Sequence, residues 1–261
     1  MSGASGGALA AVLQRGLYRV PWLHEVASGL DHRVRHGHRV RHGRGGDQVV
    51  APTTDSPESV FTEIFASNAW GAAESRSGAG STLRYTASLR TELATMLSGL
   101  QIKSLLDAPC GDFVWMRDLK MPQGMQYIGG DIVEPLIRAL DREFGRADRR
   151  FQVLDITQDE LPRAHMWLCR DCLIHLDNRQ AMAALHNFVE SDIDFLLTTS
   201  YRYFRNHDIR PGQFRMINLQ AEPFNLPRPV ASCYDYVPPH RPRRLLLYTK
   251  AQLREWARSS A

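Results

Sequence analysis

The segment SLLDAPCGDF at residues 104–113 constrains the fold of this chain more than any other stretch. A short apolar run ends in Asp107, and three compact residues then lead to Gly111. Residues 113–116 after this turn favour the start of a helix. Small residues in such a turn allow a ligand to approach the main chain closely. A strand, a small-residue turn and a helix together bring backbone N–H groups to a nucleotide-like ligand.

Two further predicted strands also end in acidic residues. Residues 127–133 predict a strand ending at Asp131, 24 residues after Asp107, and residues 149–156 predict one ending at Asp155. In a doubly wound sheet, an acid at the tip of the second strand can accept hydrogen bonds from a ribose diol. Three acids at successive strand tips behind a glycine turn are hard to explain by chance.

The rest of the central region alternates between strand and helix patterns. Residues 166–171 and 194–201 predict two more strands. Residues 133–144 and 178–191 carry apolar side chains at helical spacing, and Asp177 is placed to cap the second helix. This alternation predicts an α/β fold with a doubly wound, mostly parallel sheet covered by helices on both faces.

Positive charge is concentrated at the start of the chain. The net charge is +4, yet the first 45 residues alone hold seven arginines and only two acids. The remainder is close to neutral, which argues against specific nucleic-acid binding. We predict a flexible, basic, low-complexity extension over 1–53 and one domain over 54–261. No apolar run reaches the roughly 20 residues that a membrane span needs.

The four cysteines do not form a metal-binding pattern. Cys169 and Cys172 make one Cys-x-x-Cys pair, but a structural zinc site needs four ligands and no second pair follows. We therefore expect reduced thiols packed in the sheet and no metal. Sparse cysteine fits a reducing compartment and predicts a cytoplasmic protein, while the arginine-rich start leaves an organellar transit peptide open.

The segment before the sheet, residues 60–97, begins with an amphipathic stretch and continues through the turn at 75–81. A helix follows, with four leucines on its buried face: Leu83, Leu89, Leu93 and Leu97. The turn could be a flexible joint. Alternatively, its N–H and hydroxyl groups could close over a carboxylate or phosphate, with Arg76 supplying charge.

Several motifs together resemble the class I S-adenosylmethionine (SAM) methyltransferases, in particular a bacterial-type group that acts on small or glycan acceptors. These motifs are N-x-W at 68–70, ESRSGAGS at 74–81, DAPCGDFVWM at 107–116, CRDCLIHL at 169–176 and PFNLP at 223–227. The resemblance covers about residues 60–230. The chain departs from the usual first motif because Pro109 and Phe113 stand where that motif has glycines, so that only Gly111 remains.

The resemblance implies a Rossmann-like sheet with an N-terminal helical lid, SAM as the cofactor, and methyl transfer to a small polar or sugar acceptor. The oxygen of an acceptor hydroxyl is the expected methylation site. The cofactor contacts that the resemblance implies are Ser77, Gly78, Asp107, Ala108, Cys110, Gly111, Asp131, Ile132, Asp155, Ile156 and Arg170.

Catalytic residues are expected after the fourth strand, because ligands in such sheets bind beyond the carboxyl ends of the strands. His175 has the ordinary pKa of a general base, and Asp171 could orient it or act as the base itself. Ordinary structural roles stay open for both residues: a histidine packed at a helix entry, and a strand-end ion pair between Asp171 and Arg170.

Acceptor contacts are expected from Tyr201 and from the Pro-rich segment 205–229, which is long for a simple connection. Arg215, Asn218 and Phe224 offer a cation, an amide and an aromatic face to a sugar-like ligand. The alternative is a loop held by its own packing.

Two other functions are alternatives to methyl transfer. A nicotinamide-dependent oxidoreductase is disfavoured because its first turn normally needs three glycines. A catalytically inactive, methyltransferase-like binding module would share every cofactor residue, so the sequence leaves it open.

Overall fold

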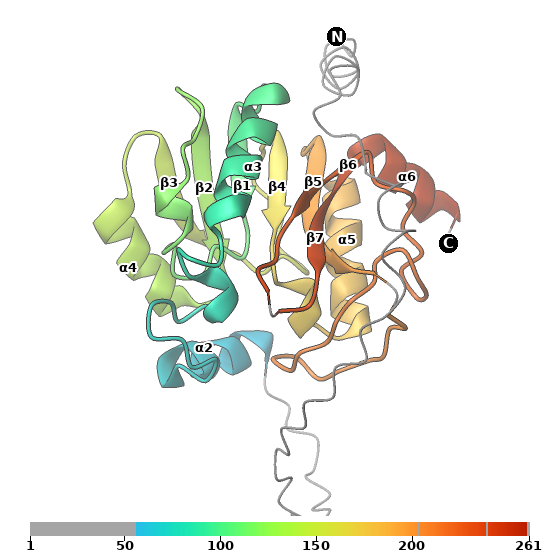
Figure 1. Cartoon of the computed structure of the whole chain (residues 1–261), viewed down its shortest axis with the longest axis horizontal. Helices are drawn as coiled ribbons and strands as arrows, with labels where there is room; N and C mark the ends of the chain where they lie inside the picture. The colour runs from blue at the N-terminus through green and yellow to red at the C-terminus, as the bar shows by residue number, and fades with distance from the viewer. Residues whose placement is uncertain (1–55, 203, 239, 260–261) are drawn as a thin grey trace, which may run out of the picture.

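A seven-stranded sheet in the order β3-β2-β1-β4-β5-β7-β6 forms the centre of the computed structural model (Figure 1). The structure describes residues 56–202, 204–238 and 240–259, so the predicted extension over 1–53 lies outside the described residues. The strands are β1 (Ser104–Asp107), β2 (Gln126–Asp131), β3 (Arg149–Val153), β4 (Met166–Cys169), β5 (Phe195–Tyr201), β6 (Ala231–Tyr234) and β7 (Arg243–Thr249). The first five strands are parallel, and β7 runs antiparallel to both of its neighbours.

Helices cover both faces of this sheet, as the sequence predicts. They are α2 (Pro57–Ser67), α3 (Ala87–Gly99), α4 (Glu134–Phe144), α5 (Asn178–Glu190) and α6 (Lys250–Ser259), with short 3-10 helices η1 (Ala79–Ser81), η2 (Met116–Asp118) and η3 (Leu173–His175). Leu105 packs in the apolar core under α3 and α4, while its neighbour Leu106 belongs to the core under α5 and α6. Successive strand residues point to opposite faces, so β1 is buried on both sides, as a central parallel strand requires.

The start of α5 follows directly from its sequence. The Asp177 carboxylate accepts a hydrogen bond from the Gln180 backbone N–H at 2.6 Å. The Gln180 side chain in turn accepts one from the Asp177 N–H at 3.3 Å. This reciprocal arrangement satisfies two backbone donors at the helix start and confirms the predicted N-cap.

The helix predicted after the glycine turn was wrong. Phe113 has a φ angle of 60°, in the left-handed region, which an α-helix cannot include. Its ring is buried against the rings of Tyr127 and Phe151, with centroids 5.2 and 5.1 Å away. Burial of this aromatic ring determines the local backbone, and β1 connects to β2 through turns and the single turn η2.

The segment between β5 and β6 has no regular secondary structure in its described part, residues 202 and 204–230. It is nevertheless packed into the core under α5 and α6 through Ile217, Leu219, Phe224 and Leu226. The indole N–H of Trp256 on α6 donates to the carbonyl of Phe224 at 2.8 Å. The segment is therefore an ordered part of the domain.

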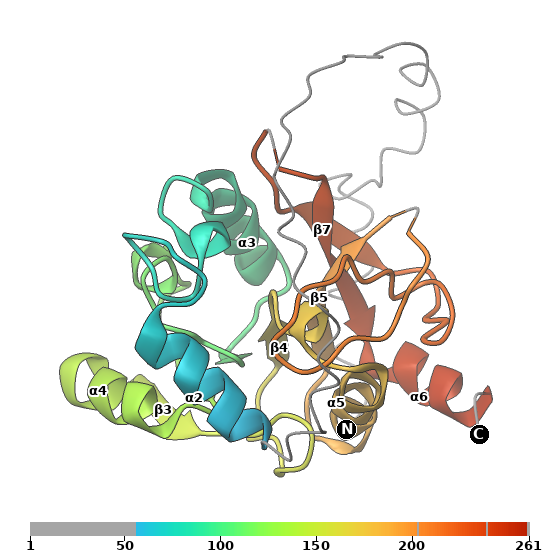
Figure 2. The ribbon, with the colours of Figure 1, turned by 90° about the horizontal axis from the view of Figure 1, so that it is seen from below.

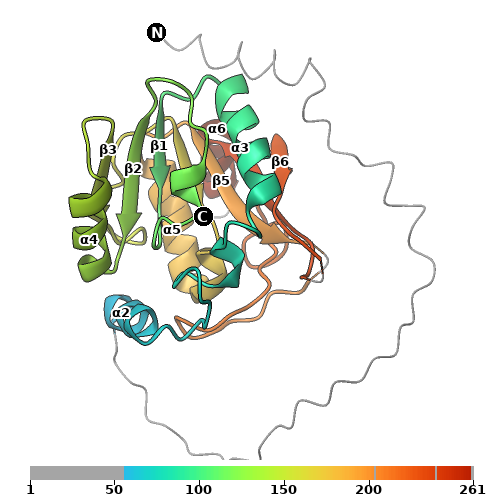
Figure 3. The same cartoon turned by 60° about the vertical axis from the view of Figure 1, so that its left-hand side comes forward.

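Helix α2 lies across the edge of the sheet at which the parallel strands end (Figures 2 and 3). Ser56 caps its start, since its hydroxyl accepts from the Ser59 N–H, and Asn68 ends it in the left-handed conformation. The chain then passes through the 70–81 loop before α3 begins. This placement gives the domain the predicted N-terminal helical lid.

We expect Asp177→Ala to lower the free energy of unfolding by about 1 kcal/mol, because α5 loses both bonds of its N-cap. Chemical denaturation of the purified protein measures this change. Asp192→Ala is the matched control, since Asp192 is an exposed acid just beyond the other end of α5. Equal stability of the two variants would contradict the assigned role.

Candidate functional site

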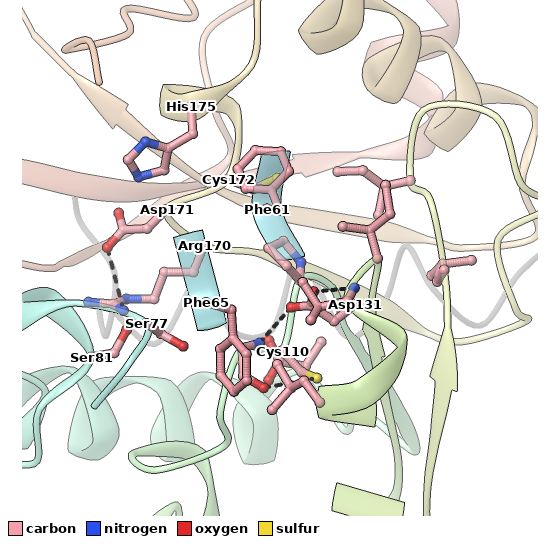
Figure 4. Close-up of a pocket in the computed structure, with 18 of the residues that line it drawn as sticks. Phe61, Phe65, Ser77, Ser81, Cys110, Asp131, Arg170, Asp171, Cys172 and His175 are labelled. Carbon is pink, nitrogen blue, oxygen red and sulfur yellow. Dashed lines mark hydrogen bonds and ion pairs between the residues drawn. The ribbon is translucent and has the colours of Figure 1, made fainter. Parts of the chain in front are cut away.

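A cavity lies between α2 and the carboxyl ends of the central strands (Figure 4). It encloses about 1030 Å³, counting the part open to solvent. Its walls come from α2, the 70–81 loop, the turn after β1 and the segments that follow β2, β3 and β4. It therefore occupies the edge where parallel α/β sheets bind ligands.

The turn after β1 is fixed by a bond to the tip of β2. The Gly111 N–H donates to the Asp131 carboxylate at 3.0 Å, and the φ angle of Gly111 is 53°. A Cβ atom at this position would lie 2.2 Å from the Ser77 hydroxyl oxygen. Both the backbone conformation and the close approach of the loop therefore require glycine here.

The next residue, Asp112, holds the 70–81 loop against the turn. Its two carboxylate oxygens accept from the Ser75 hydroxyl at 3.1 Å and from the Arg76 backbone N–H at 2.7 Å. Its own N–H donates to the Ser77 hydroxyl at 2.9 Å. One short segment, 111–112, thus binds both the tip of β2 and the loop that follows the lid helix.

Arg76 lines the cavity, and its guanidinium anchors the lid helix. Its Nη1 donates to the carbonyls of Phe65 and Ala66 at the end of α2, at 3.1 and 3.3 Å. The same guanidinium lies over the Phe65 ring, 5.4 Å from the centroid. A cation at a helix C-terminus is favourable, because the carbonyl groups there carry partial negative charge. In one interpretation of the sequence, the charge of Arg76 binds a carboxylate or phosphate of a ligand. In the structure the guanidinium binds the end of α2 instead.

Two buried acids form the floor of the cavity. Burial raises the pKa of Asp107 to about 7, against the opposing effect of the Tyr127 hydroxyl, which donates to it at 2.7 Å. Burial likewise raises the pKa of Asp131 to about 6, although backbone N–H groups, including that of Val133 at 3.1 Å, stabilise its anion. Both acids therefore change charge close to neutral pH.

Asp155 lies just beyond the end of β3, in the wall beside Ile132 and Ile156. Its carboxylate accepts from the Thr157 backbone N–H at 2.8 Å and from the Thr157 hydroxyl at 2.7 Å. The acid predicted at the third strand tip thus borders the cavity, between apolar side chains.

A four-charge cluster closes the far end of the cavity. Arg170 binds Asp235 through two hydrogen bonds of 2.9 and 3.0 Å, and Arg243 contacts the same carboxylate at 3.2 Å. Asp171 lies 2.7 Å from Arg243 and 3.5 Å from Arg170. The Arg170 guanidinium also packs over the Trp115 ring. Two guanidinium groups and two carboxylates leave the cluster without net charge, as expected for buried ionic groups.

Asp171 is held ionised at this position. Its φ angle is 52°, and the Thr199 hydroxyl accepts from its N–H at 2.9 Å and lies 3.2 Å from its carboxylate. Burial alone would raise the pKa of Asp171, but the guanidinium groups of Arg243 and Arg170 outweigh it and lower that pKa. A carboxylate with a lowered pKa in two ion pairs is a weak base at neutral pH.

His175 faces Asp171 across the cavity (Figure 4). Its Nδ1 lies 2.9 Å from the carbonyl oxygen of Gln213. Because a carbonyl can only accept, Nδ1 carries the proton, and Nε2 of the neutral ring has a free lone pair. The ring stacks on Trp70 with centroids 4.8 Å apart, and burial lowers the pKa of His175. The ring is therefore a neutral acceptor at pH 7.

Most of the cofactor contacts expected from the sequence line this one cavity. They are Ser77, Asp107, Cys110, Gly111, Asp131, Ile132, Asp155, Ile156 and Arg170, together with the expected catalytic pair Asp171 and His175. Ala108 and Gly78 do not line it. Ala108 is buried behind the turn, where its carbonyl accepts from the Trp167 indole.

The expected acceptor residues lie outside this cavity. Arg215 is fully buried over the Phe224 ring, and its guanidinium donates to Asn178 and to the His207 carbonyl. Asn218 bonds to Asn206 and to its own neighbours in the loop, at 2.8 Å for the backbone N–H. Tyr201 is buried at the end of β5, where its N–H donates to the Ile217 carbonyl. The contacts of these residues fit the alternative of a loop held by its own packing.

Several lining residues were not expected from the sequence. Phe61 and Phe65 enter from α2, Trp70 from the loop, and Cys172 and Leu176 from the segment after β4. The sequence predicts an amphipathic stretch at the start of 60–97, but it does not show what the apolar face of that stretch covers. No group of three or more potential metal ligands occurs among residues of the described ranges.

None of the described helices is both long and apolar enough to cross a membrane. The four cysteines are free, and the Cys169 thiol and burial both raise the pKa of the neighbouring Cys172 thiol. Cys110, Cys169 and Cys233 are buried and Cys172 is partly buried, in line with the expected packed thiols.

Comparison with known proteins identifies the fold. No family model matches the chain, and no curated protein matches it. The 1,6-didemethyltoxoflavin-N1-methyltransferase of Burkholderia thailandensis, solved with 1,6-didemethyltoxoflavin and S-adenosylhomocysteine, is similar with a TM-score of 0.51 and 16% identity, over 77% of this chain and 92% of that chain. The magnesium protoporphyrin IX methyltransferase of Synechocystis PCC 6803 with bound SAM gives a TM-score of 0.49 at 13% identity, over 77% and 99%.

The N-methyltransferase NodS of Bradyrhizobium japonicum WM9 gives a TM-score of 0.46 at 16% identity, over 64% of this chain and 96% of that chain. Only the first similarity has a TM-score above 0.5, and at 16% identity it supports a conclusion about architecture alone. The chain has the Rossmann-like α/β fold of SAM-dependent methyltransferases, with the sheet order β3-β2-β1-β4-β5-β7-β6.

Proposed function

We propose that this chain is a SAM-dependent methyltransferase that methylates a hydroxyl group of a small polar or sugar-containing acceptor. One observation carries the proposal. A single cavity holds the Gly111 turn, the acids at the tips of β1 and β2, and a neutral histidine with a free Nε2. The first two features suit an adenosine-containing cation, and the third suits deprotonation of a hydroxyl.

The residues of this cavity fit SAM group by group. Asp131 lies at the tip of β2, where a carboxylate can accept from both hydroxyls of a ribose. Ile132 and Ile156 offer apolar walls to an adenine ring, and Asp155 beside them offers an acceptor to its amino group. Asp107 offers a buried anion to the cationic end of the molecule.

SAM, when bound, supplies an electrophilic methyl group on its sulfonium. The chain then has two tasks, which are to position the acceptor hydroxyl and to remove its proton. His175 is suited to the second task, since Nε2 is its unprotonated nitrogen and the Gln213 carbonyl fixes the tautomer. After proton transfer the imidazolium would face the Asp171 carboxylate, which stabilises the positive charge.

Asp171 is better suited to positioning than to proton abstraction, because its carboxylate already forms ion pairs with two guanidinium groups. It is therefore assigned as a positioning residue that holds charge beside His175. His175 therefore stays the proposed general base, and Asp171 the residue that supports it.

Two other functions make different predictions. In a dinucleotide-binding sheet the strand order is 3-2-1-4-5-6, whereas here the antiparallel β7 lies between β5 and β6. This order argues against a nicotinamide-dependent oxidoreductase.

Thermal-shift measurements with SAM and with NAD separate a methyltransferase from a nicotinamide-dependent oxidoreductase. Product detection with labelled SAM and a panel of sugars separates the enzyme from an inactive binding module.

We expect Asp131→Ala to weaken SAM binding roughly 10- to 100-fold, the effect of losing a charge-assisted contact to the ribose. Isothermal titration calorimetry on the folded variant measures the affinity. Asp148→Ala is the control, since Asp148 is an exposed acid paired with Arg146 before β3. Unchanged affinity in a folded Asp131→Ala protein would refute the ribose assignment.

SAM affinity should decrease as the pH falls from about 8 to about 5, because protons then occupy the two buried acids in the free protein. Their pKa values, raised by burial to about 7 for Asp107 and about 6 for Asp131, must fall when the cationic end of SAM binds beside Asp107 and the ribose hydroxyls donate to Asp131. Binding should therefore release protons below neutral pH, which calorimetry in buffers of different ionisation enthalpy detects. Asp107→Asn should remove the part of this dependence near pH 7. An affinity that is constant over this range would contradict the coupling.

We expect His175→Ala to slow methyl transfer by roughly 10²- to 10⁴-fold, as for loss of a general base, with SAM affinity unchanged. The wild-type rate should fall on the acidic side, below the ordinary histidine value, because burial lowers the pKa of His175. His207→Ala, which removes an exposed histidine, is the control. A severe Asp171→Asn defect together with a mild His175→Ala defect would instead identify the carboxylate as the base.

A further inference from the structure

Two exposed aromatic side chains, Trp70 and Phe214, lie against His175, and we call these three rings the aromatic rim. Trp70 lines the cavity and stacks on the His175 ring, with centroids 4.8 Å and planes 25° apart. Phe214 lies outside the cavity lining, with its centroid 6.0 Å from that of His175. Trp70 is 36% exposed and Phe214 56%, and both belong to the four exposed large apolar side chains of the described ranges. The neighbourhood of the proposed base is therefore the place where exposed aromatic surface gathers.

Phe214 is fixed in position although its ring is exposed. The carbonyl oxygen of the preceding Gln213 lies 2.9 Å from Nδ1 of His175. The backbone N–H of the following Arg215 donates to the Ile174 carbonyl at 3.0 Å, and the Arg215 side chain is buried. A residue between two such contacts has little backbone freedom. Its ring is therefore preorganised, and a ligand that packs on it pays little ordering entropy.

Trp70 is held by the lid elements. The Gly71 N–H donates to the Asn68 carbonyl at 2.8 Å, which closes a tight turn around Trp70 directly after α2. A Cβ at Gly78 would lie 3.6 Å from the Trp70 Cβ, so the other end of the 70–81 loop packs behind the indole. The aromatic rim is thus built from three separate segments, and a flat ring between them would lie beside His175.

The wall of the cavity favours an uncharged acceptor. Arg76 and Arg170 are its two cations among the described residues. Arg76 donates to backbone carbonyls at the end of α2, and Arg170 is paired with Asp235 and Asp171. Neither guanidinium is left without a partner for an anionic group. The remaining acids of the wall are the ones assigned above to SAM.

The strength of the base indicates which kind of hydroxyl it can deprotonate. Burial lowers the pKa of His175, so its neutral ring is a weaker base than an ordinary histidine. A phenolic hydroxyl has a pKa of about 10. An aliphatic hydroxyl resembles water and is far less acidic. A weak base is better matched to the phenolic proton, and the flat rings of the rim match an aromatic ring.

We propose that the aromatic rim binds the ring of a phenolic methyl acceptor, an uncharged small molecule whose aromatic ring carries the hydroxyl that is methylated. This inference rests on the proposed methyl transfer and narrows its acceptor. The ring packs on Trp70 and Phe214, and the hydroxyl faces Nε2 of His175. The hydroxyl oxygen bonds to the methyl carbon as the carbon–sulfur bond breaks, the electron pair of that bond stays on sulfur, and the hydroxyl proton passes to Nε2.

2-Naphthol is a suitable probe, because it combines a flat aromatic ring system with one hydroxyl. Calorimetry with saturating S-adenosylhomocysteine, which fills the cofactor part of the cavity, should show saturable 2-naphthol binding. Cyclohexanol and methyl glucoside should bind much more weakly, since their rings are not flat and their hydroxyls are aliphatic.

Phe214→Ala should weaken 2-naphthol binding roughly 5- to 100-fold, the effect of removing one stacking ring from a flat ligand. Phe214→Tyr keeps the ring and should bind like the wild type. Tyr234→Ala is the matched control, because it removes another exposed aromatic side chain, on β6 and outside the cavity lining. With labelled SAM, Phe214→Ala should raise the KM for 2-naphthol and leave kcat nearly unchanged, since the ring contact is the same before and during transfer.

Absence of saturable 2-naphthol binding would overturn the proposal, as would equal losses in Phe214→Ala and Tyr234→Ala. Methyl glucoside binding as tight as that of 2-naphthol would identify a sugar site instead. Displacement of 2-naphthol by S-adenosylhomocysteine would place the probe in the cofactor part of the cavity and also overturn the proposal. If S-adenosylhomocysteine and SAM fail to bind, the proposed methyl transfer fails, while the Phe214 dependence of 2-naphthol binding without cofactor still decides whether the aromatic rim binds a phenol.

Discussion

The hydrogen bond from the Gly111 N–H to the Asp131 carboxylate is the contact on which the rest of the site depends. It joins the turn after β1 to the tip of β2, and it brings Asp112 into position to bind the 70–81 loop. That loop carries Arg76, which anchors the end of α2. The chain of contacts therefore runs from the sheet edge to the lid without a break. A single glycine suffices for this connection, because position 111 combines a positive φ with a 2.2 Å approach of the Ser77 hydroxyl to the place of a Cβ.

The four-charge cluster gives the opposite end of the site its own rigidity. It ties the end of β4 to β7 and to Asp235 beyond β6, and Arg170 also donates to the Gly80 carbonyl at 2.7 Å. Gly80 leaves room for the cluster, since a Cβ there would lie 3.1 Å from Arg243. Buried ion pairs of this kind are often weak contributors to stability. Their value here is geometric, because they hold Asp171 ionised in the wall opposite His175.

The sequence predicted the parts of the fold that depend on local pattern. Strand tips at Asp107 and Asp131 and the cap at Asp177 follow from apolar runs and capping residues, which act over a few positions. The irregular path after Gly111 could not be predicted, because Phe113 adopts its conformation to bury its ring against distant strands. Arg215 was expected in a ligand contact because a cation suits a polar, sugar-like ligand. It is instead buried over the Phe224 ring and donates to the His207 carbonyl and the Asn178 side chain. The lining by Phe61 and Phe65 depends on how Arg76 docks α2, which is a tertiary contact with no local signal.

The two buried acids show why such a site costs stability in the free protein. Their folded pKa values, about 7 for Asp107 and about 6 for Asp131, lie above the values of an unfolded chain. Under acidic conditions both states are protonated and nothing is lost, but as the pH rises toward the folded values the native state must bury charge that the unfolded state keeps in water. The free domain is thus penalised at neutral pH by the very groups that would attract a cation. A cationic ligand that binds only the native state would offset this penalty by mass action. Buried carboxylates that lower the stability of the free protein but favour a cationic ligand are expected at a binding site.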